Sequence, residues 1–315
     1  MRDFPFLRIV RPPITAAQLR PPGPECRTVQ FSEILTEQDH EKLSKFVRNH
    51  PHLRLRVYGD FHKNLDFLHY YPGIRHLEVD GFKLQDFDGL NDISPDLESL
   101  VLGQTKGQAH SLSFLQRFPR LRTLYVQRHT KDIEVIGSLL LLEDLTLRSI
   151  TLPDLSILRP LKRLNSLDIK LGGTKNLDLL PKIGRLRYLE LWMIRGLTDL
   201  RPIASVRTLQ YLFLQALRNV KELPSLARLH SLRRLRLQTM KGLSDLRNAA
   251  KAPALQELVV LEMPHLEPEA FRPFTKSRTL RKATVQLGSD RQKKAVAELL
   301  GLPAVDDKFT FEDRE

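Results

Sequence analysis

One six-residue pattern, L-x-x-L-x-L, returns along most of the chain and restricts its possible folds more than any other feature. Copies begin at Ile74, Leu97, Leu121, Leu142, Leu164, Leu186, Leu209, Leu232, Leu255 and Leu280, and a weaker copy begins at His52. From Ile74 onward, successive copies start 21 to 25 residues apart. A period of this length indicates a solenoid, because one unit alone cannot bury its leucines whereas stacked units bury those of their neighbours.

Each copy has the alternation of a short β-strand, with its leucines pointing inward and the intervening residues pointing outward. The second half of each repeat carries further apolar residues, as in GLTDLRPIASV at 196–206. We expect this half to return the chain through short 3₁₀ or helical turns, whose first N–H groups are capped by acidic side chains. The candidate caps are Asp154, Asp178, Asp199, Glu222 and Asp245.

With these units, and most specifically with GLTDL at 196–200 and GLSDL at 242–246, the chain resembles the leucine-rich repeat proteins. Over about residues 52–287 it is similar to their short-repeat class, found in bacterial internalins and in a protein phosphatase regulatory subunit. The resemblance implies an α/β solenoid shaped as a curved horseshoe. Its concave face would be a parallel sheet of about 10–11 strands, and 3₁₀ or short helical turns would form its convex side. The resemblance also implies a recognition module.

The ninth position of the repeat departs from this family. Leucine-rich repeats usually carry asparagine there, and its side chain ties neighbouring turns together. Here the position holds Thr105, His129, Ile150, Gly172, Ile194, Leu217, Met240 and Met263. We therefore expect apolar packing to replace an asparagine ladder in the later repeats.

The pattern divides the chain into four segments. They are a proline-rich N-terminal arm at 1–27, an N-terminal cap at 28–51, the repeats at 52–287, and a C-terminal helical cap with an acidic tail at 288–315. The arm holds six prolines and is expected to be extended or partly disordered. In the caps, Thr36 with Asp39 and then Ser289 are placed to begin helices, and Gly301 to end one. The stretch KFTFE at 308–312 is expected to form an edge strand.

The outward positions three, five and seven of successive copies should form rows on the open face, because neighbouring strands lie about 4.8 Å apart. This alignment places four aromatic residues near one another and charged residues on either side of them. The aromatic residues are Tyr188, Trp192, Tyr211 and Phe213, and the charged ones are Asp168, Glu190, Arg234 and Arg236. Exposed aromatic clusters with a charged rim are typical of protein interfaces, so these eight residues are the predicted partner-binding site. In the alternative, the rings pack on one another or under a terminal segment and bind nothing.

Asp168 and Glu190 also raise the question of an enzyme, since two carboxylates about 5 Å apart can share a proton. A hydrolase needs a pocket that encloses its substrate, however, and an open sheet face offers none. We therefore expect no enzymatic activity and no catalytic residue. The acidic pair is expected to accept a lysine or arginine of a protein partner.

Histidines crowd the N-terminal part of the chain, at His50, His52, His62, His69 and His76. Only His76 is predicted to face outward, and metal binding needs converging ligands, so we expect no metal site. No nucleotide-binding or cofactor-binding motif occurs, so no cofactor is expected either. Cys26 is the single cysteine and cannot form an internal disulfide.

The net charge of +13 is concentrated in residues 201–301, which hold 19 lysines and arginines against 8 acidic residues. Such a region attracts polyanions, so nucleic-acid binding by residues 201–301 is the alternative to protein binding. In a basic protein the same charges can also form only a solvated surface. The sequence has no run of about 18 apolar residues and no signal-like apolar stretch near its start. We therefore expect a cytoplasmic protein without a membrane span.

Overall fold

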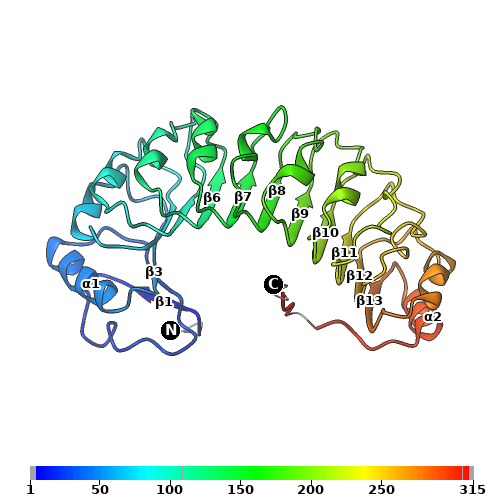
Figure 1. Ribbon diagram of the computed structural model, residues 1–315. Helices are drawn as coiled ribbons and strands as arrows, with labels where there is room; N and C mark the ends of the chain where they lie inside the picture. The colour runs from blue at the N-terminus through cyan, green and yellow to red at the C-terminus, as the bar shows by residue number, and fades with distance from the viewer. Residues whose placement is uncertain (1–4, 108, 307, 312–315) are drawn as a thin grey trace. The chain divides into compact units, whose positions relative to one another are not determined.

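Each repeat opens with a short strand and returns through a turn, as the computed structural model shows for residues 5–107, 109–306 and 308–311 (Figure 1). These described residues divide into two compact units, with the boundary between Leu145 and Thr146. Neighbouring strands pair in parallel, and their order in the sheet is the order in the chain. The thirteen strands exceed the 10–11 expected, because two more precede the repeats.

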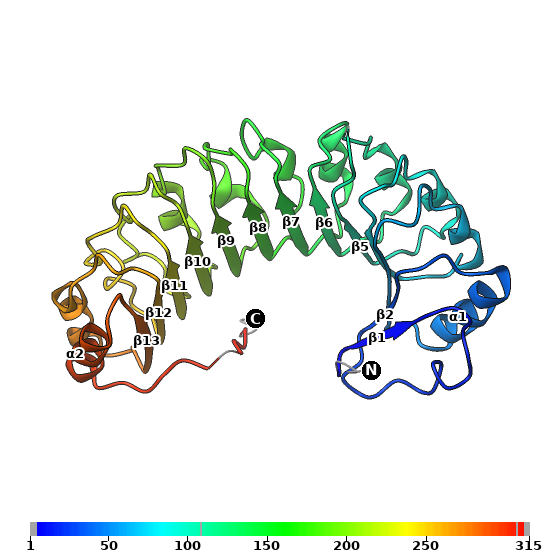
Figure 2. The ribbon, with the colours of Figure 1, turned by 180° about the vertical axis from the view of Figure 1, so that it is seen from behind.

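The strands are four or five residues long. They are β1 (Leu7–Val10), β2 (Thr28–Phe31), β3 (Arg54–Tyr58), β4 (His76–Asp80), β5 (Ser99–Leu102), β6 (Thr123–Gln127), β7 (Asp144–Arg148), β8 (Ser166–Lys170), β9 (Tyr188–Trp192), β10 (Tyr211–Gln215), β11 (Arg234–Gln238), β12 (Glu257–Leu261) and β13 (Lys282–Gln286). In the second unit the strands β8 to β13 lie side by side, and Figure 2 shows them from behind. Their register pairs leucine with leucine, as in Leu189 with Leu212 and Leu212 with Leu235.

The returning segments consist mostly of 3₁₀ helix. These are η1 (Asp66–Tyr70), η2 (Asp88–Asp92), η3 (Ser113–Arg117), η4 (Ile133–Ser138), η5 (Ser156–Leu158), η6 (Leu180–Lys182), η7 (Arg201–Ser205) and η8 (Pro268–Lys276). Three of the expected acidic caps are present: Asp154, Asp199 and Asp245 each accept a hydrogen bond, at 2.7–2.9 Å, from the backbone N–H two residues later. In the turn at Asp178 the acceptor is instead the side chain of Asn176.

The interior between strands and turns is filled by the repeated leucines. In the repeat that begins at Leu186, the side chains at positions one, four and six are fully buried. The ninth-position residues from Ile150 to Met263 are buried as well, and the five apolar side chains among these six replace the asparagine ladder as expected. The turns approach each other closely at Gly172, since a Cβ there would lie 2.0 Å from the carbonyl oxygen of Ile150.

The residue after each of the strands β6 to β12 adopts a left-handed conformation although none of them is glycine. These residues are Arg128, Ser149, Leu171, Met193, Ala216, Thr239 and Glu262, with φ between 49° and 68°. From Ser149 to Thr239 the backbone N–H donates to the carbonyl of the last residue of the following strand, for example from Leu171 to Trp192 at 2.8 Å. This bond extends each ladder beyond the strand and offsets the cost of the left-handed backbone, about 1 kcal/mol per residue.

The N-terminal segment is more ordered than its proline content suggests. Strand β1 pairs with β2, so residues 7–10, expected in an extended arm, belong to the sheet. Helix α1 (Glu37–Asn49) begins at Thr36, which forms the expected reciprocal cap with Asp39. Asp39 also accepts a hydrogen bond from the backbone of Ile14 at 2.6 Å, which ties the arm to α1. Residues 1–4 lie outside the described part of the chain.

At the C-terminal end, helix α2 (Asp290–Leu300) contacts η8 and strand β13. Ser289 and Gln292 form a reciprocal cap at its start, and Gly301, with φ 62°, ends it as expected. The expected edge strand at 308–312 is not formed: residues 308–311 have no strand structure, and Glu312 lies outside the described residues. Residues 308–311 instead contact the exposed side of β9 to β11.

Candidate binding face

Strand register fixes the rows of outward side chains in the second unit. Row three contains Ser166, Tyr188, Tyr211, Arg234, Glu257 and Lys282; row five contains Asp168, Glu190, Phe213, Arg236, Val259 and Thr284; row seven contains Lys170, Trp192, Gln215, Gln238, Leu261 and Gln286. We call the surface made by these rows the open face. All eight predicted site residues belong to it. Rows three and seven lie at opposite ends of the strands, about 13 Å apart along a strand.

Asp168 and Glu190 share one lysine of their own chain. The Lys170 ammonium lies 2.8 Å from Oε2 of Glu190 and 3.6 Å from Oδ1 of Asp168. Thr146 donates its hydroxyl to Oδ2 of Asp168 at 3.0 Å, and Tyr188 donates its hydroxyl to Oε2 of Glu190 at 2.9 Å. A basic group of a partner would therefore have to compete with Lys170 for these carboxylates.

Burial controls the protonation of this cluster. It raises the pKa of Asp168 to about 7, while the Lys170 ammonium opposes the rise and nearby Glu190 adds to it. Burial also raises the pKa of Tyr188, and the two carboxylates strengthen that effect. Glu190 itself is only 7% exposed. Asp168 therefore holds its proton to a higher pH than an exposed aspartate does, although the Lys170 ammonium lies close to it.

Two tyrosines of row three are covered by the C-terminal tail. The ring of Phe309 lies 5.2 Å from that of Tyr211, and the ring of Phe311 lies 6.4 Å from that of Tyr188. The tyrosines contact each other at 5.1 Å and the phenylalanines at 4.9 Å, all edge to face. Tyr188 and Tyr211 are thus covered by a terminal segment, one of the two arrangements considered from the sequence.

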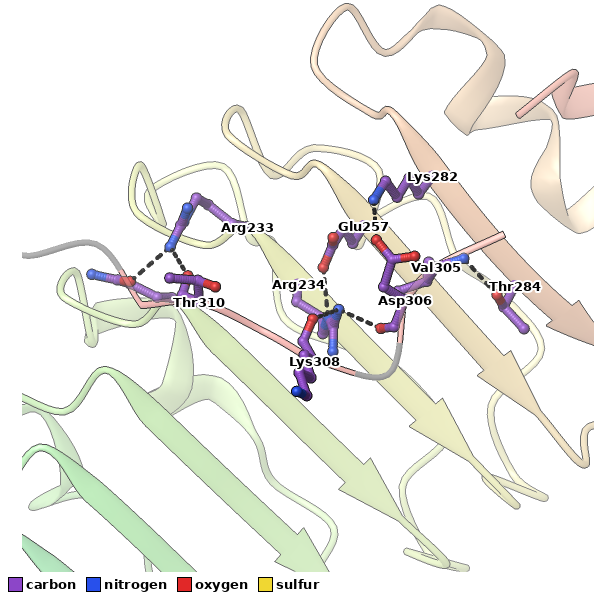
Figure 3. Close-up of polar contacts among 10 residues, drawn as sticks. Arg233, Arg234, Glu257, Lys282, Thr284, Val305, Asp306, Lys308 and Thr310 are labelled. Carbon is purple, nitrogen blue, oxygen red and sulfur yellow. Dashed lines mark hydrogen bonds and ion pairs between the residues drawn. The ribbon is translucent and has the colours of Figure 1, made fainter. Parts of the chain in front are cut away.

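Two arginines bind the backbone of this tail: Arg234, the first residue of β11, and Arg233, which precedes it (Figure 3). Arg234, only 4% exposed, donates from Nε to Glu257 at 2.6 Å and from Nη2 to the carbonyls of Asp306 and Lys308 at 2.9 and 3.1 Å. Arg233 donates from Nη2 to the carbonyl of Thr310 at 2.6 Å. These guanidinium groups bind main-chain oxygens, which any extended peptide can offer.

The other two predicted aromatic residues have different neighbours. Phe213 is 9% exposed and lies under the Arg236 guanidinium, whose carbon is 4.4 Å from the ring centre. Trp192 is half-buried at the far end of β9, where the Arg148 guanidinium lies 5.4 Å from its ring centre. The four rings thus lie on one face with different neighbours: the tyrosines against the tail, Phe213 against Arg236 and Trp192 against Arg148. Their joint role in partner binding stays a prediction.

Several residues that contact the predicted ones were not among the predicted partner-binding residues. Lys170 and Arg148 complete the acidic and tryptophan sites, while Arg233, Phe309 and Phe311 build the tail site. One sequence signal could have found the tail: two phenylalanines alternate in KFTF after an acidic stretch, in a chain whose arginines crowd β11. Local patterns alone do not say where such a tail lies.

Other candidate sites are fewer. Within the described ranges, His, Cys, Asp and Glu side chains form no group of three or more that could hold a metal ion. His76 begins β4, and burial lowers its pKa. A cavity of about 620 Å³ in the first unit is lined by exposed lysines, namely Lys63, Lys83, Lys106 and Lys131. Over the same described ranges, no helix has the length and apolarity of a membrane span.

Comparison with known proteins bears on the fold. No protein-family model matches this sequence, and neither does any curated protein. Among solved structures, an internalin from Listeria monocytogenes is 20% identical with a TM-score of 0.58, covering 85% of this chain and 81% of that chain. A leucine-rich repeat protein from Leptospira interrogans is 14% identical with a TM-score of 0.43 and 90% of each chain covered.

A complex of TLR13 with ssRNA13 also matches, at 16% identity and a TM-score of 0.47, with 89% of this chain but 53% of that chain covered. Identities this low show the fold alone, and the two TM-scores below 0.5 add no support. The likeness to the internalin agrees with what the strands show, which is parallel pairing in chain order with a 3₁₀ turn in most repeats. On these grounds the chain has the leucine-rich repeat fold.

Proposed function

We propose that this chain is a non-enzymatic scaffold that binds a protein partner on the open face. One observation carries the proposal: this face already holds a polypeptide, because its arginines and aromatic rings bind the backbone and side chains of the tail. A rigid sheet loses little conformational freedom when it binds, and this favours recognition over a broad surface.

The remaining site residues supply further contacts in this proposal. Trp192, with Arg148 over its ring, presents an amphipathic anchor at the end of β9 opposite the row-three residues that contact the described tail. Tryptophan and arginine are the residues most enriched among those that dominate binding energy. In this proposal Asp168 and Glu190 pair with Lys170, which fixes the side chains at the centre of the face, and they perform no chemistry.

Capture of partners by an immobilised chain tests the proposal. We expect Trp192→Ala to weaken binding of the captured partner by about 2 kcal/mol or more, which is close to a 30-fold loss of affinity. Arg228→Ala, at an exposed position in the returning segment before β11, is the matched control and should leave capture unchanged. Because Phe213 is buried, its truncation would also disturb packing and is less informative. Equal capture by the Trp192 variant and wild type would exclude this part of the face.

The alternative function is electrostatic binding of nucleic acid or another polyanion by residues 201–301. Their excess of 19 basic over 8 acidic residues favours it. Ion pairs reduce the effect, since Arg201, Arg234 and Arg247 each contact a carboxylate at 2.6–2.7 Å. Carboxylates of the chain itself therefore compete with a polyanion for these arginines.

Gel-shift assays with random oligonucleotides at two salt concentrations separate the two functions. Polyanion binding predicts a steep salt dependence, with a log–log slope of about −0.7 to −0.9 per phosphate contacted. Glutamine substitutions at exposed basic residues of 201–301, compared with glutamines at the four lysines of the first-unit cavity, would show which region binds. Protein binding through the open face predicts no retained oligonucleotide at physiological salt.

A further inference from the structure

We propose that the partner of the open face is an extended peptide segment with two aromatic side chains separated by one residue, and that the chain's own tail occupies this site until such a segment displaces it. This inference rests on the proposed function and adds the chemistry of the partner. The tail is taken as residues 303–306 and 308–311, the parts that the structure describes.

The first part of the tail is anchored on β13. The carbonyl of Pro303 accepts a hydrogen bond from the backbone N–H of Ala283 at 2.9 Å, and the backbone N–H of Val305 donates to Thr284 Oγ1 at 2.9 Å. The carboxylate of Asp306 pairs with the ammonium of Lys282 (Figure 3). From this anchor the tail crosses the strands instead of pairing with them, so it reaches row three of β11, β10 and β9 in turn.

The second part of the tail places alternate side chains in two adjacent ring sites. Phe309 lies against Tyr211, with the guanidinium carbons of Arg233 and Arg234 at 5.1 and 5.0 Å from its ring centre. Phe311 lies against Tyr188, and the Arg187 guanidinium is 5.3 Å from its ring centre. The residue between the two phenylalanines contributes its carbonyl to Arg233. The face thus reads an aromatic–any–aromatic spacing while binding the backbone irrespective of sequence.

Several features suit a displaceable occupant. Phe311 remains 39% exposed, and the side chains of Lys308 and Thr310 are exposed. Because the described tail forms no strand, it is not built into the sheet ladder. A tethered segment competes at an effective concentration in the millimolar range, so a free peptide of equal affinity would bind the intact chain much more weakly than a chain with its tail removed from the site.

The test uses the full chain and a fluorescein-labelled peptide with the sequence of residues 303–315. In the variant Phe309→Ser/Phe311→Ser the tail no longer fills the ring sites. We expect this variant to bind the peptide at least about tenfold more tightly than wild type, measured by fluorescence anisotropy. A peptide with both phenylalanines replaced by serine should bind neither protein.

A matched control changes the same tail without emptying the ring sites. Lys308→Ser/Thr310→Ser alters two exposed side chains and keeps the carbonyls that bind Arg234 and Arg233, so this variant should bind the peptide as weakly as wild type does. Tyr211→Ala added to Phe309→Ser/Phe311→Ser should abolish the gain. Circular dichroism and the Trp192 emission, which reports the far strand ends, verify that each variant is folded.

Equal peptide binding by wild type and Phe309→Ser/Phe311→Ser would overturn the inference, and so would equal binding of the serine peptide. Either result would make the tail a fixed part of the fold or a non-specific contact. The proposed function would survive such a result if partner capture still depended on Trp192. Conversely, Phe309→Ser/Phe311→Ser could bind the peptide while Trp192→Ala left partner capture unchanged. That result would support the tail site and exclude Trp192 from the function.

Discussion

The ammonium of Lys170 lies 2.8 Å from Oε2 of Glu190 on the neighbouring strand β9 and 3.6 Å from Oδ1 of Asp168 on its own strand β8. One cation therefore serves two carboxylates in a largely buried site. Burial and the second carboxylate raise the pKa of Asp168 to about 7. The folded chain thus retains a proton there at pH values where the unfolded chain has released it.

This retained proton predicts a pH dependence for Asp168→Asn. Between pH 4 and 7 the folded state binds more protons at this site than the unfolded state, so the wild-type group lowers the free energy of unfolding as the pH rises. Asparagine cannot ionise. As the pH rises from 4 to 8, the free energy of unfolding of the variant should therefore increase by about 2 to 4 kcal/mol relative to that of wild type. Urea denaturation at several pH values measures this difference.

Asp178→Asn, at an exposed carboxylate outside the cluster, is the control for Asp168→Asn. A stability difference between Asp168→Asn and wild type that stays constant from pH 4 to 8 would contradict the raised pKa.

His40 predicts a dependence of the opposite sign. Its ring is stacked between Phe67 and Tyr70, each at 5.2 Å, and its Nδ1 lies 2.9 Å from the Tyr71 hydroxyl. Burial lowers the pKa of His40 from 6.5 to about 4, and the nearby His62 adds to this effect. As the pH falls from 6.5 to 4, the unfolded chain gains a proton that the folded chain does not, so stability is lost.

His40→Gln should reduce this acid-induced loss by about 2 kcal/mol, because glutamine does not titrate. The expected readouts are urea denaturation at pH 4.5 and 6.5 and an NMR titration of the His40 ring with a midpoint close to pH 4. A His40 ring that titrates near 6.5 would show that it is not buried in solution.

Trp192 predicts a spectroscopic signature of partner binding. As the single tryptophan, half-buried beneath Arg148, it should be partly accessible to acrylamide in the free chain. Partner binding at this end of the strands should shift its emission to the blue and reduce the quenching, because the ring loses contact with water. Arg148→Gln should increase quenching in the free chain, since it removes the covering guanidinium. A bound partner that changes neither emission nor quenching would place the interface elsewhere.

The repeats could be predicted because their information is local and redundant. Leucines at fixed spacing define each strand, and Thr36, Ser289 and Gly301 act within one helical turn of their own positions. The alignment of copies also placed Tyr188, Glu190 and Trp192 on one strand of the open face. The side chains that surround each ring could not be read from this alignment: four residue steps along the strand separate Tyr188 from Trp192 by about 13 Å, and each has its own neighbours.

The tail could not be placed from sequence for a different reason. Residues 303–306 and 308–311 have no cap or turn signal that fixes a local structure, and the alternation in KFTF did not produce a strand, so their position depends on partners far away in the chain. Phe309 contacts Tyr211, which lies 98 residues earlier in the sequence. The carbonyl of Thr310 accepts a hydrogen bond from Arg233, which lies 77 residues earlier. Strand β1 was missed similarly, because its pairing with β2 spans a proline-rich loop.

The close approach of turns at Gly172 yields a prediction on stability. A methyl group there would lie 2.0 Å from the carbonyl oxygen of Ile150, so Gly172→Ala must push two neighbouring repeats apart. Backbone atoms cannot yield as a flexible side chain does, and we expect a loss of about 2 kcal/mol or more in the free energy of unfolding. Gly73→Ala, where no atom lies within 4 Å of the added Cβ, is the matched control and should change stability by less than about 0.5 kcal/mol. Equal stability of the two variants in urea denaturation would show that the turns at Ile150 and Gly172 are further apart than this fold requires.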